Sequence, residues 1–248
     1  MTVKKAKQMN LTIFAGTFNP IHIAHLIVAE SVRTELNAEK ILFIPSFIPP
    51  QKADCRQRLK GEGLSPSPET QFIAGNQAFI DLADAEHRLN MVKLAIKNNP
   101  FFEVSDIELK LQGTSYTYNT IQELYRQNPQ IKDRINFIIG ADAFNNIKTW
   151  YKYEELAKLI NFIVLARPNY NISCHSESKC HAETSSASQT LKQVQGDSFI
   201  QYQFVEAPRI DISSSYIRQR IKEQKSIKYL VTTEVEKYII ENKLYMNY

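Results

Sequence analysis

Apolar residues recur along the chain with two spacings, and these predict most of its secondary structure. Short runs of consecutive apolar residues bounded by turn-forming residues are typical of buried strands. The predicted strands cover residues 11–15, 41–44, 101–104, 135–139, 162–165 and 201–205. Apolar residues at three- and four-residue steps predict a first helix after the turn at 16–20, marked by Ile23, Leu26, Ile27 and Leu36. Further predicted helices cover residues 88–96, 120–126, 153–159, 214–221 and 234–242.

Strands and helices alternate along the whole chain. The first fifty residues form a βαβ pattern, whose crossover is expected to be right-handed. Alternation of this kind predicts an α/β fold, with a Rossmann-like, doubly wound and mainly parallel sheet and helices on both faces. A chain of 248 residues is long enough for one such domain. We therefore expect an N-terminal tail at 1–10 and a single domain over 11–248.

Two stretches do not follow this alternation. Residues 54–84 are rich in turn formers, and residues 169–198 are rich in Ser and Gln but poor in large apolar side chains. The second composition cannot bury enough surface to order the segment by itself. We predict that both stretches are insertions. Within the second, the pair Cys174-His175 recurs as Cys180-His181; adjacent Cys-His pairs are not a usual zinc pattern, so we predict a local repeat and no metal site.

Composition and charge exclude some classes of protein. The 30 Lys and Arg residues against 26 Asp and Glu give a net charge of +4 without a dense basic cluster, so we expect no nucleic-acid partner. No apolar run approaches the roughly 18 residues that a membrane-spanning helix needs, and no secretory signal is recognisable. With 3 cysteines, an odd set, the chain is predicted to be cytoplasmic, without a membrane partner. The oligomeric state is left open.

The segment GTFNPIHIAHL, residues 16–26, lies where a predicted strand passes into a helix. A helix N-terminus offers unpaired N–H groups and the positive end of the helix dipole, and Gly16 lets the backbone approach an anion closely. His22 and His25 are three residues apart and should project from the same side of the first turn. Two imidazoles can donate hydrogen bonds to a polyphosphate and, if protonated, offset charge on a leaving pyrophosphate.

A second candidate anion site lies near the other end, in ISSSYIR at residues 212–218. Ser213 or Ser214 is a good N-cap, and Arg218 falls one turn later on the same face, where its guanidinium can bind phosphate oxygens. Taken alone, this segment could equally be an ordinary capped surface helix. Together with the histidine pair, it suggests one triphosphate held from two sides.

These two segments resemble a known superfamily. GTFNPIHIAH is similar to the [GT]xFxPxHxGH element of the HxGH nucleotidyltransferases, with Asn19 where Asp is frequent and Ala24 in place of Gly. ISSSYIR resembles the ISSTxxR element of the same superfamily. The resemblance implies that the chain binds ATP. The residues it implies at the ATP site are Gly16, Thr17, Phe18, His22, His25, Ile212, Ser213, Ser214, Ser215 and Arg218.

Three middle segments resemble one branch, the nicotinate-nucleotide adenylyltransferases. IPPQK at 48–52 is similar to that family's PPHK, with Gln51 for His. GTSYTYNTIQEL at 113–124 resembles GxSYTxDTL, with Asn119 for Asp, and residues 137–156 match the strand, GAD turn and TWxxxxxL helix. The resemblance implies transfer of AMP from ATP to nicotinate mononucleotide. It also implies the residues at the mononucleotide site, which are Asn19, Lys52, Thr117, Gly140, Asp142, Trp150 and Tyr151.

The implied roles agree with the chemistry of the residues. Trp150 would stack on the pyridine ring, unless it is a core residue, and the N–H groups of Tyr151 and Thr117 would receive the nicotinate carboxylate. Asp142 suits ribose hydroxyls, unless it is only a helix cap. His22, His25, Lys52 and Arg218 are the predicted catalytic residues, which orient oxygens and stabilise the transition state. Mg²⁺ is expected to arrive with ATP, since the sequence shows no carboxylate cage for it.

Three alternatives stay open at this stage. A related transferase of the same fold would use nicotinamide mononucleotide or phosphopantetheine as acceptor. A non-catalytic relative would bind nucleotide without releasing pyrophosphate, and a nucleic-acid-binding module would show affinity that depends strongly on salt.

Overall fold

The computed structural model describes residues 11–50, 82–166, 200–208 and 210–246. The chain divides into two compact units. Unit 1 is Met1–Phe14, Ile27–Leu42 and Thr117–Arg209, and unit 2 is Ala15–Leu26, Phe43–Tyr116 and Ile210–Tyr248. The single domain over 11–248 stays a prediction, and so do the two insertions, because residues 51–81 and 167–199 lie outside the described residues.

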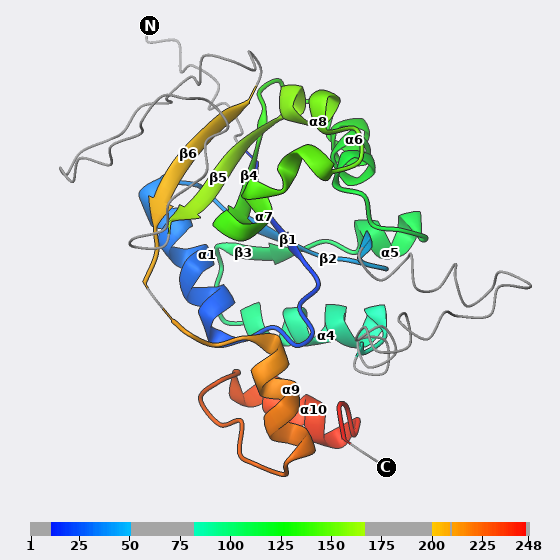
Figure 1. Ribbon diagram of the computed structural model, residues 1–248, viewed down its shortest axis with the longest axis vertical. Coiled ribbons are helices and arrows are strands. Elements are labelled where there is room, and N and C mark those ends of the chain that lie inside the picture. Colours follow the sequence, from blue (N-terminus) through cyan, green and yellow to red (C-terminus); the bar gives the residue numbers. More distant parts are fainter. Residues whose placement is uncertain (1–10, 51–81, 167–199, 209, 247–248) are drawn as a thin grey trace, which may run out of the picture. The chain divides into compact units, whose positions relative to one another are not determined.

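Six parallel strands form one sheet in the order β3-β2-β1-β4-β5-β6 (Figure 1). The strands are β1 (Thr12–Gly16), β2 (Ile41–Pro45), β3 (Phe102–Val104), β4 (Ile135–Gly140), β5 (Ile160–Ala166) and β6 (Gln201–Glu206). The chain builds outward from β1 through β2 to β3, and the order then reverses at β4. This is the doubly wound arrangement, in which ligands bind beyond the carboxyl ends of the strands.

The central strands are apolar at consecutive positions, and burial explains why. Successive residues of a strand point to opposite faces of the sheet. In β5, Phe162, Ile163 and Val164 are all buried, and in β4 the same holds for Phe137 and Ile138. Both faces of these strands are therefore covered, as expected for a parallel sheet. The α/β fold predicted from the alternation of strands and helices is confirmed.

The helices of unit 1 pack against β4, β5 and one another. They are α6 (Thr117–Gln127), α7 (Ala141–Asn145), the 3₁₀ helix η1 (Ile147–Thr149) and α8 (Tyr153–Leu159). Helix α7 packs on β4 and β5, and α8 contacts β5, η1 and α6. Helix α1 (Ile23–Glu35) begins in unit 2 and continues in unit 1.

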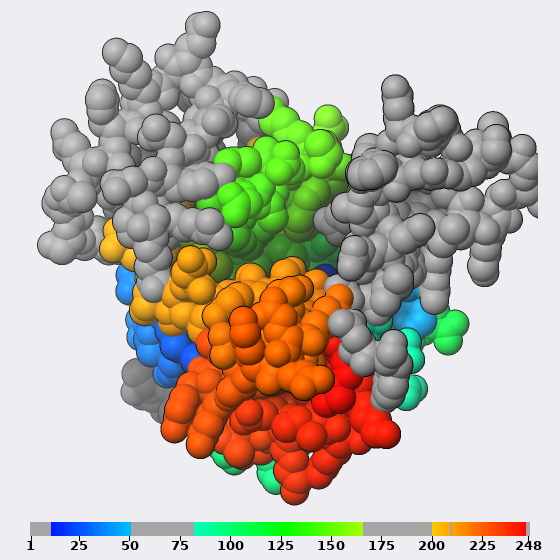
Figure 2. Space-filling model, turned by 60° about the horizontal axis from the view of Figure 1, so that its bottom comes forward, coloured from blue at the N-terminus to red at the C-terminus, as the bar shows by residue number. Residues whose placement is uncertain are grey.

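The remaining helices belong to unit 2. They are α4 (Ala85–Ile96), α5 (Ile107–Leu111), α9 (Ser214–Lys222) and α10 (Thr233–Glu241). Helix α4 contacts both β3 and α10. Figures 1 and 2 both show α9 beside α10, in orange and red. None of the described helices is long and apolar enough to cross a membrane.

The predicted strands and longer helices are confirmed, with shifts at their ends. The structure also contains three short elements that were not predicted, which are α5, α7 and η1. An element of five residues or fewer makes too few turns to display a helical period. Helix α6 begins at Thr117 and not at residue 120.

Candidate active site

The loop that follows β1 turns sharply at Phe18. This residue has a φ of 46°, in the left-handed region, and its side chain is 3% exposed. The Phe18 ring lies over Gly16, where an added Cβ would meet ring carbon Cζ at 3.2 Å. A side chain at this position would therefore require the Phe18 ring to shift by a few tenths of an ångström. This reason for glycine differs from the close approach of an anion expected from the sequence.

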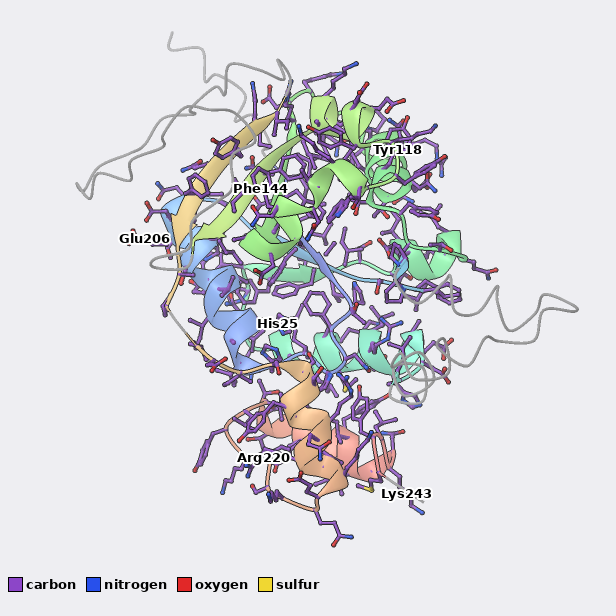
Figure 3. All side chains as sticks on the ribbon, in the orientation of Figure 1. His25, Tyr118, Phe144, Glu206, Arg220 and Lys243 are labelled. Carbon is purple, nitrogen blue, oxygen red and sulfur yellow. The ribbon has the colours of Figure 1, made fainter. Side chains whose placement is uncertain are left out.

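The two predicted histidines converge at the start of α1. His22 immediately precedes the helix, and His25 lies in its first turn (Figure 3). Their rings stack, with centroids 3.7 Å apart and planes inclined by 24°. The Phe18 ring meets the His25 ring edge-on, at a centroid distance of 5.1 Å. Packing thus fixes the orientation of both imidazoles before any ligand binds.

One hydrogen bond sets the tautomer of His25. The backbone N–H of His22 donates to Nδ1 of His25 at 3.2 Å, so this nitrogen carries a lone pair. Burial, with a smaller contribution from the charge of His22, lowers the pKa of His25 well below its ordinary value. The neutral ring then carries its proton on Nε2, which makes Nε2 a hydrogen-bond donor.

His22 is also neutral at physiological pH. Its side chain is 6% exposed, and burial lowers its pKa from 6.5 to about 4. In the unliganded chain both imidazoles can therefore donate hydrogen bonds to phosphate oxygens. The positive charge considered from the sequence is therefore absent from both rings at neutral pH.

The buried neutral state of His22 predicts how stability depends on pH. The pKa of His22 is lower in the folded chain than in the unfolded chain, so the unfolded chain binds more protons between about pH 6.5 and pH 4. The contribution of His22 to the free energy of unfolding should be fully present above this window. It should be lost as the pH falls through the window, which lowers the free energy of unfolding by on the order of 3 kcal/mol. Urea unfolding at about pH 7.5 and about pH 4 measures this decrease. His22→Gln should weaken the dependence, with the contribution of His25 remaining, and an unchanged slope in that variant would contradict the assignment.

Helix α9 begins with a capped first turn. Ser213 is the N-cap, and its Oγ accepts the N–H of Tyr216 at 3.1 Å. The hydroxyl of Ser214 donates to the carbonyl of Pro20 at 2.8 Å. This contact joins the start of α9 to the turn that leads into His22. The two candidate phosphate-binding segments, from opposite ends of the chain, therefore lie side by side in unit 2.

Arg218 strengthens the same connection. Its Nη1 donates to the carbonyl of Asn19 at 2.9 Å, and its Nη2 donates to Oγ of Ser215 at 3.2 Å. Among the described residues, Nε of Arg218 and Nδ1 of His22 are buried without a hydrogen-bond partner. Buried polar atoms are normally paired. Two such atoms in adjoining segments indicate a place for a ligand with several acceptor oxygens.

Asn19 is buried in the turn before His22. It is 3% exposed, and its Oδ1 accepts the N–H of Ala83 at 3.1 Å and the hydroxyl of Tyr245 at 2.8 Å. The peptide bond to Pro20 is cis. Asn19 thus holds the turn together, and its contact with nicotinate mononucleotide stays a prediction.

Sequence reasoning missed Arg88, which is completely buried on α4. Its guanidinium donates to backbone carbonyls of the loops after β1 and β2 and of the segment just before α4. These hydrogen bonds join the three segments. The acceptors are the carbonyls of Ala83 at 2.9 Å, Thr17 at 3.0 Å, Phe47 at 2.7 Å and Ser46. Burial lowers the pKa of Arg88 to about 10, so it stays charged at neutral pH. The signal in the sequence was a charged residue on the same helix face as the apolar Met91 and Val92, one turn later.

The start of the IPPQK segment is also placed in unit 2. Ile48 forms a β-bridge with Thr114, and its carbonyl accepts the N–H of Ser115 at 2.9 Å. This brings the segment beside the start of the GTSYT segment. Lys52 itself lies outside the described residues, so its role stays a prediction.

In unit 1, two predicted residues lie at or just after the end of β4. Gly140 is the last residue of the strand and is exposed, and an added Cβ there would meet nothing within 4 Å. Asp142 is exposed in the first turn of α7. Both therefore lie at the carboxyl end of a parallel strand, where α/β folds bind ligands.

The predicted aromatic residues lie after η1. Trp150 is half-buried and packs edge-on against Phe137, with centroids 5.9 Å apart and planes at 83°. It is therefore not a fully buried core residue. Tyr151 is 46% exposed. Thr117 is the first residue of α6, so its N–H makes no hydrogen bond within that helix.

Two further residues of unit 1 adjoin this group and were not predicted. Tyr118, labelled in Figure 3, meets Tyr151 edge-on at a centroid distance of 6.2 Å. The ammonium of Lys152 lies 4.7 Å from the centroid of the Tyr118 ring and 5.6 Å from that of Tyr151. The cation therefore links the two segments that hold Thr117 and Tyr151. The sequence offered no signal for this contact.

Comparison with known proteins decides the family. Residues 13–60 and 73–220 match the cytidylyltransferase-like family. A probable nicotinate-nucleotide adenylyltransferase of Geotalea daltonii is 36% identical over 246 residues, which cover 96% of this chain and 98% of the relative. The nicotinate-nucleotide adenylyltransferase of Bacillus subtilis is 33% identical over 233 residues, with coverage of 94% and 96%. The chain belongs to the nicotinate-nucleotide adenylyltransferase family.

A solved structure shows the same fold. It is the nicotinic acid mononucleotide adenylyltransferase of Plasmodium falciparum complexed with APC, with a TM-score of 0.62 and 18% identity, covering 96% of this chain and 98% of that one. The same protein complexed with NaAD also has a TM-score of 0.62. At this identity the likeness concerns the fold alone, and it agrees with the doubly wound sheet.

Two departures from the pattern of the nicotinate-nucleotide adenylyltransferases have a simple structural setting. Ala24, where the pattern has Gly between the histidines, is 8% exposed, so its methyl group is packed inside the protein. Asn119, where the pattern has Asp, is exposed on α6. Gln51 lies outside the described residues.

Proposed function

We infer that this chain transfers the adenylyl group of ATP to nicotinate mononucleotide, releasing pyrophosphate and forming deamido-NAD, a step of NAD biosynthesis. The observation that carries the proposal is identity of 33% and 36%, over nearly the full length, with adenylyltransferases named for this acceptor. The stacked histidines and Arg218, joined through the Asn19–Pro20 turn, support it.

ATP is proposed to bind through the groups gathered in unit 2. Neutral His22 and His25 would donate hydrogen bonds to phosphate oxygens, and the N-terminal ends of α1 and α9 would add backbone N–H groups and favourable dipoles. Arg218 would supply the positive charge. These groups stabilise negative charge as it moves onto the leaving pyrophosphate. Lys52 is proposed to act in the same way.

Nicotinate mononucleotide is proposed to bind through residues of unit 1. Trp150 would stack on the pyridine ring, and the N–H groups of Thr117 and Tyr151 would receive its carboxylate. Gly140 and Asp142 would lie at the ribose. The nucleophile is the 5′-phosphate, which is already an anion, so the attack on the α-phosphorus needs no general base and no covalent enzyme intermediate.

Mg²⁺ is proposed to be carried on the phosphate oxygens of ATP. Bound there, Mg²⁺ would neutralise part of the charge on the triphosphate.

An acceptor assay tests the proposed function. Pyrophosphate release from MgATP is measured with nicotinate mononucleotide, nicotinamide mononucleotide or phosphopantetheine as acceptor. We expect the highest kcat/KM with nicotinate mononucleotide, because both oxygens of its carboxylate can accept from the N–H groups of Thr117 and Tyr151, whereas the amide offers one acceptor oxygen and a donor NH₂ group. Preference for the amide would contradict the roles of these two residues. Nucleotide binding without pyrophosphate release from any acceptor would identify a non-catalytic relative.

A further inference from the structure

The turn at Asn19 is the junction of the ATP site in unit 2. Its carbonyl accepts Nη1 of Arg218, and its Oδ1 accepts the N–H of Ala83 and the hydroxyl of Tyr245. Resting on the proposed function, we propose that Tyr245 is a positioning residue for the triphosphate, because its hydroxyl fixes Asn19 and thereby Arg218 and the approach to His22. Tyr245 lies beyond residue 220, where the match to the cytidylyltransferase-like family ends.

The orientation of the Asn19 amide explains the role of the hydroxyl. A backbone N–H and a phenol O–H both meet the oxygen of this amide, at 3.1 Å and 2.8 Å. With Asn19 almost completely buried, a reversed amide would place its NH₂ group against the N–H of Ala83. The two donors therefore select one orientation. Without the hydroxyl, the amide oxygen loses one of these two donors, and the carbonyl that orients Arg218 is less firmly placed.

The path of the C-terminal segment shows how Tyr245 reaches the turn. Lys243, labelled in Figure 3, and Tyr245 have φ values of 52° and 64°, in the left-handed region that residues other than glycine seldom adopt. Between them, the N–H of Leu244 donates to the carbonyl of Ile239 at 3.0 Å. The segment after α10 thus folds back on the helix, and its conformation is maintained by contacts of this kind.

Burial keeps the phenol of Tyr245 protonated. Burial raises the pKa of Tyr245, although the charges of Arg218 and Arg88 act in the opposite direction. The phenol can therefore donate throughout the neutral pH range. Tyr245 therefore lies near both arginines that donate to carbonyls of the loop after β1.

Removal of the hydroxyl tests the proposal. In Tyr245→Phe we expect kcat/KM for MgATP to fall about 5- to 10-fold, the effect of one lost hydrogen bond, with less than about 2-fold change in KM for nicotinate mononucleotide. Tyr229→Phe is the matched control. It loses the same hydroxyl from a residue that is 80% exposed, and its kinetics should be unchanged. Equal kinetics of Tyr245→Phe and the unmodified chain would overturn the proposal.

A double-mutant cycle separates positioning from a general loss of stability. Arg218→Met is combined with Tyr245→Phe, and the second substitution should then cause less than about 2-fold further loss, because Tyr245 acts through Asn19 and Arg218. Multiplicative losses would overturn the proposal. The rise in Tm produced by MgATP gives a second measurement. It should be smaller in Tyr245→Phe than in the unmodified chain, whereas a variant that is only less stable would keep the full rise.

Failure of the proposed function would be recognised separately. If the unmodified chain released no pyrophosphate with nicotinate mononucleotide, the acceptor assignment would fail before any variant was compared. The rise in Tm with MgATP would still show whether Tyr245 positions the phosphate site.

Discussion

Replacement of His25 by alanine is expected to lower kcat by about 100-fold or more, the size of effect seen when one donor to developing charge is removed. The physical reason is the fixed tautomer. Because Nδ1 of His25 accepts the backbone N–H of His22, its Nε2–H is the donor available to the triphosphate. The alanine variant loses this donor and also the stack that holds the His22 ring. Steady-state kinetics with MgATP and nicotinate mononucleotide measure the loss.

Two further variants control this result. His87→Ala removes an imidazole of unit 2 that contacts Tyr238, and it should leave kcat within about 2-fold. His25→Asn keeps an acceptor for the N–H of His22 and a shorter donor, and its kcat should lie between those of alanine and histidine. Circular dichroism establishes that each variant is folded. An unchanged kcat in folded His25→Ala would remove the histidine pair from the mechanism.

Replacement of Arg88 by methionine is expected to lower the free energy of unfolding by about 3 to 5 kcal/mol, a range typical of breaking a buried charged network. Methionine fills a similar volume but cannot donate. The carbonyls of Thr17, Ser46, Phe47 and Ala83 would each lose a hydrogen bond, and buried acceptors without partners are destabilising. Urea unfolding at pH 7 measures the change.

The matched control for this variant is Arg126→Met. Arg126 is 74% exposed and pairs with Glu123 on the same helix, so its loss should change the free energy of unfolding by less than about 0.5 kcal/mol. If Arg88→Met were as stable as this control, the carbonyl contacts of Arg88 would contribute little to holding the loops after β1 and β2.

The sequence predicted the position of the two phosphate-binding segments but not how they are joined. A histidine pair after a strand and a Ser-Arg pair at a late helix have local signatures, because strand ends and helix caps depend on neighbouring residues. The bonds from Ser214 to Pro20 and from Arg218 to Asn19 connect residues almost a chain length apart. No local pattern contains them.

The charge state of the histidines illustrates the same limit. The residue type alone allowed a protonated or a neutral imidazole, since the ordinary pKa of histidine lies close to neutral pH. Burial decides between them, and it lowers the pKa of both His22 and His25. The amount of burial depends on Phe18 and on the packing of α1, which only the folded chain defines.

The sequence by itself determined the order of the strands and longer helices, the doubly wound class and the residues that resemble the nucleotidyltransferases. Each of these depends on spacing along the chain. The tertiary structure alone decided that Asn19 is a junction, that Arg88 binds four loop carbonyls and that Tyr245 reaches the Asn19 turn. These roles arise from hydrogen bonds between distant segments, and a buried donor is paired with whichever acceptor the fold brings within reach.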